Sequence, residues 1–300
     1  HPQVETYEVK DVDGTSLGIL YLDYYTRASK SAGAWMTEFR HYTKVNGQEE
    51  MPLVSVVYNF SPAVGDAPVL LSWDDTETMF HEFGHALHGM FANTRFASLS
   101  GTNVWWDFVE LPSQFMENFA VEKDFLRTFA FHYATGEPIP DDLIDRIVKS
   151  RNFLAGYSCL RQVSFGLLDM AYYTMKEPFT ADIIPFEKQA WKKAIITKQL
   201  PDTCMTTQFS HIMAGGYAAG YYSYKWAEVL DADAFSVFKK NGIFDRKTAQ
   251  SFRDNILSKG GTEHPAILYR RFRGQDPTID ALLERNGIKR HTKDDNRKQQ

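Results

Sequence analysis

The sequence predicts an α+β fold that is predominantly α-helical, with a small N-terminal β-sheet followed by helices. Two observations carry this prediction. Over the first 75 residues apolar side chains alternate with a period of two, and from Asp74 onward they recur with the 3.6-residue period of an α-helix. A chain of 300 residues with 43% hydrophobic and 24% charged residues is large enough to bury a core of this kind.

The predicted sheet opens with a hairpin. Strands over residues 4–9 and 17–24 flank the turn signal Asp13-Gly14. Residues 52–58 are rich in β-branched side chains and lie between turn signals, which predicts a further strand. We expect residues 54–58 to form an edge of the sheet, where an extended peptide could add its backbone as another strand.

Amphipathic spacing predicts helices in the rest of the chain, separated by breakers such as Gly136-Glu137-Pro138 and Gly260-Gly261. The first helix begins near Asp75 or Thr76, either of which could be its N-cap. The predicted helices cover residues 76–91, 112–132, 141–175, 186–196, 217–239 and 246–258.

The domain organisation predicted from these elements is simple. Neither an internal repeat nor a low-complexity linker is present, so we expect one domain over residues 1–290 and a frayed polar tail over residues 291–300. The chain begins at His1 rather than Met, which indicates a piece of a longer polypeptide or a processed product. We expect a cytoplasmic location, with the periplasm as the alternative.

Composition excludes several classes of protein. The 33 basic and 38 acidic residues give a net charge of -5 without a concentrated basic stripe, so nucleic acid is not an expected partner. The longest apolar run, residues 52–58, has the length of a strand, so no membrane span is expected. The two cysteines, Cys159 and Cys204, are too few for a disulfide framework and lack the CxxC spacing of a metal site.

The first predicted helix carries the HExxH pentad His81-Glu82-Phe83-Gly84-His85. On an α-helix, His81 and His85 stand about 40° and one turn apart, close enough for both imidazoles to hold one Zn²⁺. Glu82 lies about 60° from His85 on the same side, where its carboxylate can act as a general base without being a ligand. The opposite face carries an apolar stripe that we expect to face the core: Met79, Phe83, Leu87 and Met90.

A catalytic zinc site needs a third protein ligand. The extended metzincin pattern requires glycine at position 88 and histidine at position 91, but the sequence has His88 and Phe91, so that class is excluded. A His₂Glu site is the natural alternative, and spacing does not choose among the candidates Glu110, Asp107 and Glu117. His88 lies too far along the helix axis to join the site directly, and we expect it to pack or to form a hydrogen bond.

Three blocks of residues make the sequence similar to the thimet oligopeptidase and peptidyl-dipeptidase family of zinc peptidases. The resemblance extends over nearly the whole chain, including Gly260-Gly261-Thr262 near its end. The blocks are residues 80–88, Ser100-Gly101-Thr102 with residues 107–114, and His211 with residues 215–224. The last block is more similar to the bacterial peptidyl-dipeptidase branch than to the thimet branch.

This resemblance implies a zincin fold of the gluzincin type, in which the HExxH pentad lies on the active-site helix. It implies one Zn²⁺ per chain, held by His81, His85 and Glu110, with Glu82 as the general base. It also implies that three further side chains donate hydrogen bonds to the tetrahedral intermediate: His211, Tyr217 and Tyr224. From spacing alone, Tyr217, Tyr221 and Tyr224 would also suit an aromatic helix face packed in the core.

The implied activity is hydrolysis of short unstructured peptides, and the bacterial branch implies release of dipeptides from free C-termini. Capture of a C-terminal carboxylate requires a fixed cation, for which Arg161, Lys225 and Arg270 are candidates. The alternatives are an endo-oligopeptidase of the same family and a truncated, non-catalytic domain that binds zinc or peptides. Family members carry a further, helical N-terminal half that forms the opposite wall of a channel, and we expect this half to be a partner of the present chain.

Overall fold

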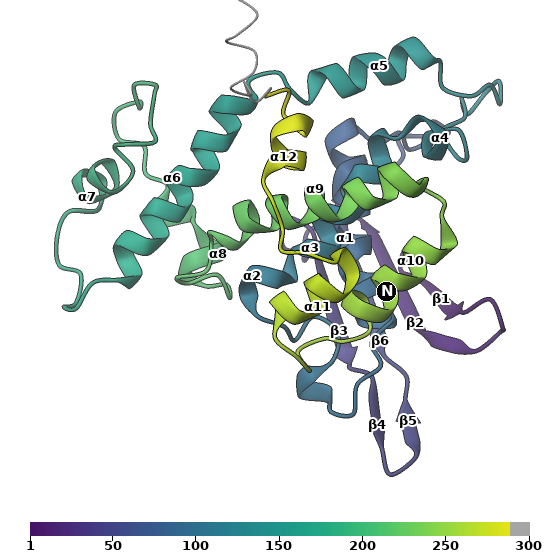
Figure 1. Ribbon diagram of the computed structural model, residues 1–300. Helices are drawn as coiled ribbons and strands as arrows, with labels where there is room; N and C mark the ends of the chain where they lie inside the picture. The colour runs from purple at the N-terminus through teal and green to yellow at the C-terminus, as the bar shows by residue number, and fades with distance from the viewer. Residues whose placement is uncertain (289–300) are drawn as a thin grey trace, which may run out of the picture.

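The computed structural model describes residues 1–288 and has the predicted class, an α+β fold dominated by helices with a small mixed sheet (Figure 1). The predicted tail, residues 291–300, lies outside the described residues. The strands are β1 (Glu5–Lys10), β2 (Ser16–Tyr25), β3 (Trp35–Arg40), β4 (Thr43–Val45), β5 (Gln48–Glu50) and β6 (Leu53–Phe60). The α-helices are α1 (Trp73–Met90), α2 (Trp106–Val109), α3 (Leu111–Glu117), α4 (Lys123–Leu126), α5 (Asp141–Ser150), α6 (Ala155–Tyr173), α7 (Ile183–Ala190), α8 (Ser210–Met213), α9 (Ser223–Asn241), α10 (Arg246–Phe252), α11 (Pro265–Arg273) and α12 (Asp280–Arg285). Shorter helical turns are η1 (Ala97–Leu99), η2 (Asn118–Val121), η3 (Thr206–Gln208) and the π-helical η4 (Arg253–Leu257).

The four main strands lie in the order β1-β2-β6-β3, and the β4–β5 hairpin projects away from them (Figure 1). β1 and β2 form the predicted antiparallel hairpin, while β6 pairs parallel with β2 and antiparallel with β3. The prediction that residues 54–58 form an edge is wrong, because β6 is paired on both sides. The edge on this side is β3, which was not predicted because the buried carboxylate of Glu38 interrupts its apolar alternation.

Helix α1 begins at Trp73 because Ser72 and Asp75 form a capping box. Ser72 Oγ accepts the N–H of Asp75 at 3.1 Å, and Asp75 Oδ2 accepts the N–H of Ser72 at 3.2 Å. The N-cap is therefore Ser72, and the prediction of Asp75 or Thr76 is wrong. The predicted apolar stripe packs on the sheet as part of one cluster: Met79, Phe83, Ala86, Leu87 and Met90 with Leu20, Val54, Val56, Tyr58 and Phe60.

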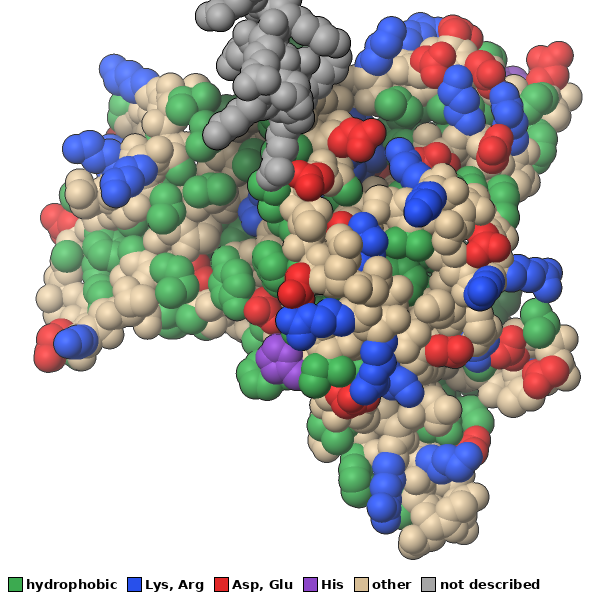
Figure 2. Space-filling view, viewed as in Figure 1, with side chains coloured by type: hydrophobic (Ala, Val, Ile, Leu, Met, Phe, Trp, Pro, Cys, Tyr) green, Lys and Arg blue, Asp and Glu red, His purple; other side chains and the backbone are tan. Residues whose placement is uncertain are grey.

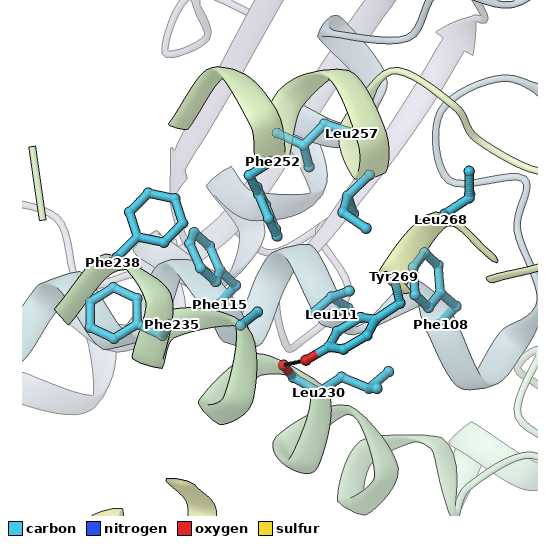
Figure 3. Packing of buried hydrophobic residues seen from close by; sticks show 12 residues of the cluster. Phe108, Leu111, Phe115, Leu230, Phe235, Phe238, Phe252, Leu257, Leu268 and Tyr269 are labelled. Carbon is cyan, nitrogen blue, oxygen red and sulfur yellow. Dashed lines mark hydrogen bonds between the residues drawn. The ribbon is translucent and has the colours of Figure 1, made fainter. Parts of the chain in front are cut away.

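A second core forms where α3, α9, α10 and α11 meet (Figure 3). Phe115 of α3 stacks on Phe252 with 4.2 Å between ring centroids. Gly84 of α1 packs directly on α3, since a Cβ at this position would lie 2.4 Å from the carbonyl oxygen of Pro112. Such a close approach requires glycine. α1 is therefore packed between the sheet and the helical core.

Two of the predicted helices are each broken. The helix predicted over residues 112–132 divides into α3, η2 and α4, where the amide of Asn118 donates a hydrogen bond to Asp231 at 2.7 Å. The helix predicted over residues 141–175 divides into α5 and α6 near Leu154, which has a left-handed φ of +54°. In both places tertiary or local backbone geometry overrides a continuous amphipathic pattern.

The other predicted helices exist with shifted boundaries. Residues 186–196 correspond to α7, residues 217–239 to α9, and residues 246–258 to α10 continued by η4. A third cluster packs α6 and α7 against the segment that precedes α9. Among the described strands and α-helices, the pattern missed short or edge elements: β3, β4, β5, α2, α8, α11 and α12.

Basic and acidic side chains are interspersed on the face shown in Figure 2, in keeping with the small net charge. Surface ion pairs such as Arg146–Asp142 are exposed and contribute little to stability. Within residues 1–288, no helix is long and apolar enough to cross a bilayer.

Candidate metal centre and active site

Helix α1 presents His81 and His85 to the same carboxylate. The Nε2 atoms of both imidazoles lie 3.2 Å from Oε2 of Glu110, and one ligand atom from each residue lies within 4.8 Å of the others. Glu110 is 1% exposed and lies at the junction of α2 and α3. Two imidazole nitrogens and one carboxylate oxygen form the donor set of a catalytic zinc site, so these residues fit a zinc ion.

The structure separates the three candidates for the third ligand. Glu110 is oriented toward the histidines by Ser113, whose hydroxyl donates to Glu110 Oε2 at 2.8 Å. Glu117 lies at the other nitrogen of His81, with its Oε1 2.6 Å from Nδ1. In that position Glu117 orients the imidazole of His81. It contacts Nδ1 and leaves Nε2, the nitrogen that faces Glu110, for a metal. Asp107 lines a neighbouring cavity, so the geometry favours Glu110.

The charges of this group are strongly coupled. Burial opposes a charge on His81, but its contacts with Glu110 and Glu117 outweigh burial and raise its pKa well above the usual value. Burial also opposes ionisation of Glu110, but the adjacent His85 and His81 lower its pKa well below the usual value. A buried carboxylate that stays ionised is suited to bind a cation.

Glu82 is 6% exposed, and its Oε2 atom has no hydrogen-bond partner among residues 1–288. Burial raises its pKa, and the neighbouring His81 and His85 only partly oppose this effect. A buried polar atom without a partner costs free energy unless a ligand or water satisfies it. A carboxylate with a raised pKa is also better matched to proton transfer near neutral pH.

The predicted hydrogen-bond donors come from the segment around α8 and the start of α9. Tyr217 donates a hydrogen bond to Oε1 of Glu110, and its ring stacks on Tyr224 with 4.9 Å between centroids. The His211 ring lies 6.0 Å from Tyr217 and 6.2 Å from Tyr224. Burial raises the pKa of both tyrosines, so their hydroxyls stay protonated donors. All seven predicted site residues line one cavity of about 430 Å³: His81, Glu82, His85, Glu110, His211, Tyr217 and Tyr224.

Tyr217 precedes helix α9 rather than lying on it. The buried carboxylate of Asp169 accepts the backbone N–H groups of Ala219 and Tyr221 at 2.8 and 2.9 Å, which holds this stretch as a turn. Ala219 accordingly has a left-handed φ of +56°. The prediction of a helix from residue 217 is wrong for this reason, and Tyr217 and Tyr224 do not share a helix face.

Sequence reasoning missed two walls of the cavity. Trp106 of α2 packs on the glycine-rich segment, since a Cβ at Gly216 would lie 2.4 Å from its ring. The Trp106 ring also lies 5.1 Å from that of Tyr217. Trp106 directly precedes the motif over residues 107–114, so its place in the sequence was a signal for a site residue. No motif of this kind lies on β3. The other lining residues come from α2, from the start of β3 with the residue before it, and from the loop that follows η1: Val109, Ala34, Trp35, Met36, Thr102 and Asn103.

Four residues considered from the sequence do not contribute to this cavity. His88 is completely buried, both its ring nitrogens lack a hydrogen-bond partner in the described part of the chain, and burial lowers its pKa to about 3. It therefore packs rather than hydrogen bonds. The three candidate cations have partners elsewhere: Phe165 for Arg161, Glu228 for Lys225 and Asp276 for Arg270.

A helix-borne HExxH pentad, with a buried glutamate from the next helices facing both histidines, defines the class of the metallopeptidases. The comparisons agree with this class. Residues 1–288 match the family model described as Peptidase family M3, so the chain belongs to peptidase family M3.

Curated relatives with two different names match almost the whole chain. This chain is 45% identical over 292 residues to oligopeptidase A of Escherichia coli (strain K12). The aligned region covers 96% of this chain and 43% of that protein. This chain is 39% identical over 292 residues to dipeptidyl carboxypeptidase of Salmonella typhimurium. The aligned region covers 97% of this chain and 43% of that protein. The chain thus spans less than half the length of these relatives.

Solved structures of low sequence identity share the fold. PZ peptidase A with an inhibitor superimposes with a TM-score of 0.56 at 16% identity, covering 89% of this chain and 42% of that chain. The M32 carboxypeptidase from Deinococcus radiodurans R1 has a TM-score of 0.55 at 16% identity, covering 90% of this chain and 55% of that chain.

Proposed function

We propose that this chain is the catalytic part of a zinc peptidase that hydrolyses short unstructured peptides. The proposal depends on one observation, the convergence of His81, His85 and Glu110 beside the buried side chain of Glu82, whose Oε2 atom has no hydrogen-bond partner among residues 1–288. One zinc ion held by these three ligands would polarise the scissile carbonyl and lower the pKa of a water molecule.

The protein groups supply the proton transfers and the donors. Glu82 accepts a proton from the attacking water and passes it to the leaving amine. The hydroxyls of Tyr217 and Tyr224 and a ring N–H of His211 donate hydrogen bonds to the oxyanion that develops on the substrate. The Tyr217 hydroxyl bonds Glu110 in the structure, so it exchanges this acceptor for the oxyanion during the reaction.

We further propose that the substrate backbone pairs with β3. This strand is the sheet edge on the side of the cavity, and the lining residues Trp35 and Met36 belong to it. An unpaired edge binds an extended peptide through main-chain groups and is therefore tolerant of its side chains. β3 thus takes the role first predicted for residues 54–58.

Two cleavage modes are consistent with this chemistry. The motif over residues 216–222 favours release of dipeptides from free C-termini. Internal cleavage is favoured by the higher identity to oligopeptidase A and by the lack of Arg or Lys among the described residues that line the cavity. In the whole protein, the remaining chain could supply both the opposite wall and a cation. The predicted cytoplasmic location stays a prediction.

The first experiment separates an enzyme from a domain that only binds zinc or peptides. Cleavage of a quenched fluorescent peptide is measured with and without a chelator, followed by addition of zinc. We expect activity that is lost with the chelator and restored by zinc. A protein that binds zinc and the peptide but never cleaves it would support the non-catalytic alternative.

The second experiment separates the cleavage modes. Products of one peptide with a free or an amidated C-terminus are mapped by mass spectrometry, using this chain and the full-length protein that contains it. Dipeptide release that amidation blocks indicates a peptidyl-dipeptidase. Internal cuts that are insensitive to amidation indicate an endo-oligopeptidase and leave the zinc mechanism unchanged.

A further inference from the structure

The edge strand β3 carries a buried carboxylate that the proposed mechanism does not use. The side chain of Glu38 is 1% exposed. Its Oε1 atom accepts hydrogen bonds from the backbone N–H and the hydroxyl of Thr102, both at 3.1 Å. Its Oε2 atom lies 2.9 Å from Nδ1 of His41 without forming a well-aligned hydrogen bond. Glu38 therefore ties β3 to a loop 64 residues later in the chain.

The glycine of the Ser100-Gly101-Thr102 motif is explained by this carboxylate. Gly101 has a left-handed φ of +56°, and a Cβ there would lie 2.2 Å from Oε1 of Glu38. Any other residue would be strained and would displace the carboxylate. The motif thus has a structural partner on β3, because the loop must approach Glu38 closely for Thr102 to donate both of its hydrogen bonds.

The opposite side of the same loop packs on the other motif that the mechanism leaves unexplained. A Cβ at Gly260 would lie 2.1 Å from the carbonyl oxygen of Leu99, and a Cβ at Gly261 would lie 2.5 Å from that of Asn103. The N–H of Gly261 also donates a hydrogen bond to the Leu99 carbonyl at 2.9 Å. Residues 99–103 are therefore held between Glu38 on one side and the diglycine turn on the other.

Both elements joined by Glu38 line the active-site cavity. β3 contributes Trp35 and Met36, and the loop contributes Thr102 and Asn103. We infer that Glu38 is a positioning residue that fixes the separation of β3 from residues 99–103, and with it the width of the groove for an extended peptide. The inference rests on the proposed function. Because Glu38 does not touch the reacting groups, its loss should weaken substrate binding more than it slows chemistry.

The first test is a graded series of variants in the zinc-loaded protein. Glu38→Gln keeps the shape of the side chain and one acceptor oxygen, whereas Glu38→Leu places an apolar side chain there and removes both acceptors. We expect KM to rise about tenfold in Glu38→Leu and less in Glu38→Gln, with kcat within about threefold of wild type and zinc content unchanged. The matched control is Glu50→Gln, which changes an exposed glutamate on β5 and should leave KM unchanged.

Two readouts separate failure of this inference from failure of the proposed function. In a Glu82→Gln background, the Kd of the same peptide is measured without turnover. Hydrogen exchange at the Thr102 amide reports on the loop without any peptide. We expect Glu38→Leu to weaken Kd about tenfold and to speed exchange about tenfold. If Glu38→Leu has the same KM, Kd and exchange rate as the wild type, the inference is overturned. Cleavage of the peptide by the wild type would still support the proposed peptidase function. Faster exchange with unchanged Kd and KM would also overturn it, because the loop would then have no effect on binding.

A double-mutant cycle tests the contact itself. Gly101→Ala should raise KM because its new Cβ displaces the Glu38 carboxylate, and adding Glu38→Ala should remove that clash. We therefore expect the double variant to show a smaller rise in KM than the product of the two single effects. Independent, multiplicative effects would show that Gly101 and Glu38 do not act as one clamp and would overturn the inference.

Discussion

The metal-ligand region and the donor segment of the active site are built in different ways. The proposed ligands come from α1 and from the junction of α2 and α3. Helices α1 and α3 pack backbone to backbone at Gly84, and both Glu82 and Glu110 are buried. The donor segment consists of α8, which carries the exposed His211, and the following turn, which contacts Asp169 and Trp106. We expect the first region to hold the proposed metal rigidly and the second to shift toward a bound substrate. We therefore expect metal affinity and transition-state stabilisation to be separable by mutation.

The largest effect is expected for Glu110→Ala, which removes a ligand from the rigid region. Metal content should fall to a small fraction of one ion per chain, and peptide cleavage should be lost with it. Metal analysis after dialysis checks this outcome. Full occupancy in Glu110→Ala, together with loss of metal in Glu117→Ala, would show that Glu117 is the third ligand.

Glu82→Gln is expected to lower kcat by about 10³- to 10⁴-fold while metal content stays at the wild-type level. The amide keeps the size of the side chain but cannot accept the proton of the attacking water. Steady-state kinetics and metal analysis of the same preparation measure both properties. Loss of the metal together with activity would assign Glu82 to the ligand set instead.

Tyr217→Phe and Tyr224→Phe probe the donor segment. Each should lower kcat by about 10²-fold with little change in KM or metal content, because a donor to the developing oxyanion acts mainly in the transition state. Lower thermal stability with near-normal kcat per folded molecule would instead indicate that the two rings serve packing only.

Glu117→Gln is expected to have a smaller effect, confined to the rigid region. The carboxylate lies 2.6 Å from His81 Nδ1 and orients the imidazole. Its loss should weaken metal affinity about 10- to 100-fold. Competition with a chelator of known affinity measures the change, and Glu228→Gln is a control outside the cavity. An unchanged affinity would remove the orienting role of Glu117.

The smallest effect concerns pH and His88 on α1. Burial lowers the pKa of His88 to about 3, below its usual value of 6.5, so the folded state favours the neutral imidazole. The stability gained from keeping His88 neutral is complete above pH 6.5 and is lost as the pH falls toward 3. The loss in the free energy of unfolding is about 1.4 kcal/mol by pH 5.5. Denaturation curves at pH 7.5 and 5.5 should show this extra loss in wild type but not in His88→Met. Equal losses in both proteins would contradict it.

Local sequence signals alone predict the placement of the candidate site residues on α1. The HExxH spacing on an amphipathic helix predicts two ligands and a base, because the period of the helix alone places these side chains on one face. The β1–β2 hairpin was likewise predicted from strand alternation and the Asp13-Gly14 turn. The block containing Glu110 was also recognisable in the sequence, but the sequence did not show how far the Glu110 carboxylate lies from the two histidines.

Only the tertiary structure decided which groups meet. Strand order placed β3 rather than β6 at the edge, because pairing across the sheet depends on chain topology and not on composition. The α2–α3 junction favoured Glu110 over Glu117, although both are acidic residues near the same helix. Asp169 converted a predicted helix into the turn that carries Tyr217. In each case the outcome depends on contacts between residues that are distant in the sequence. A local sequence pattern does not encode such contacts.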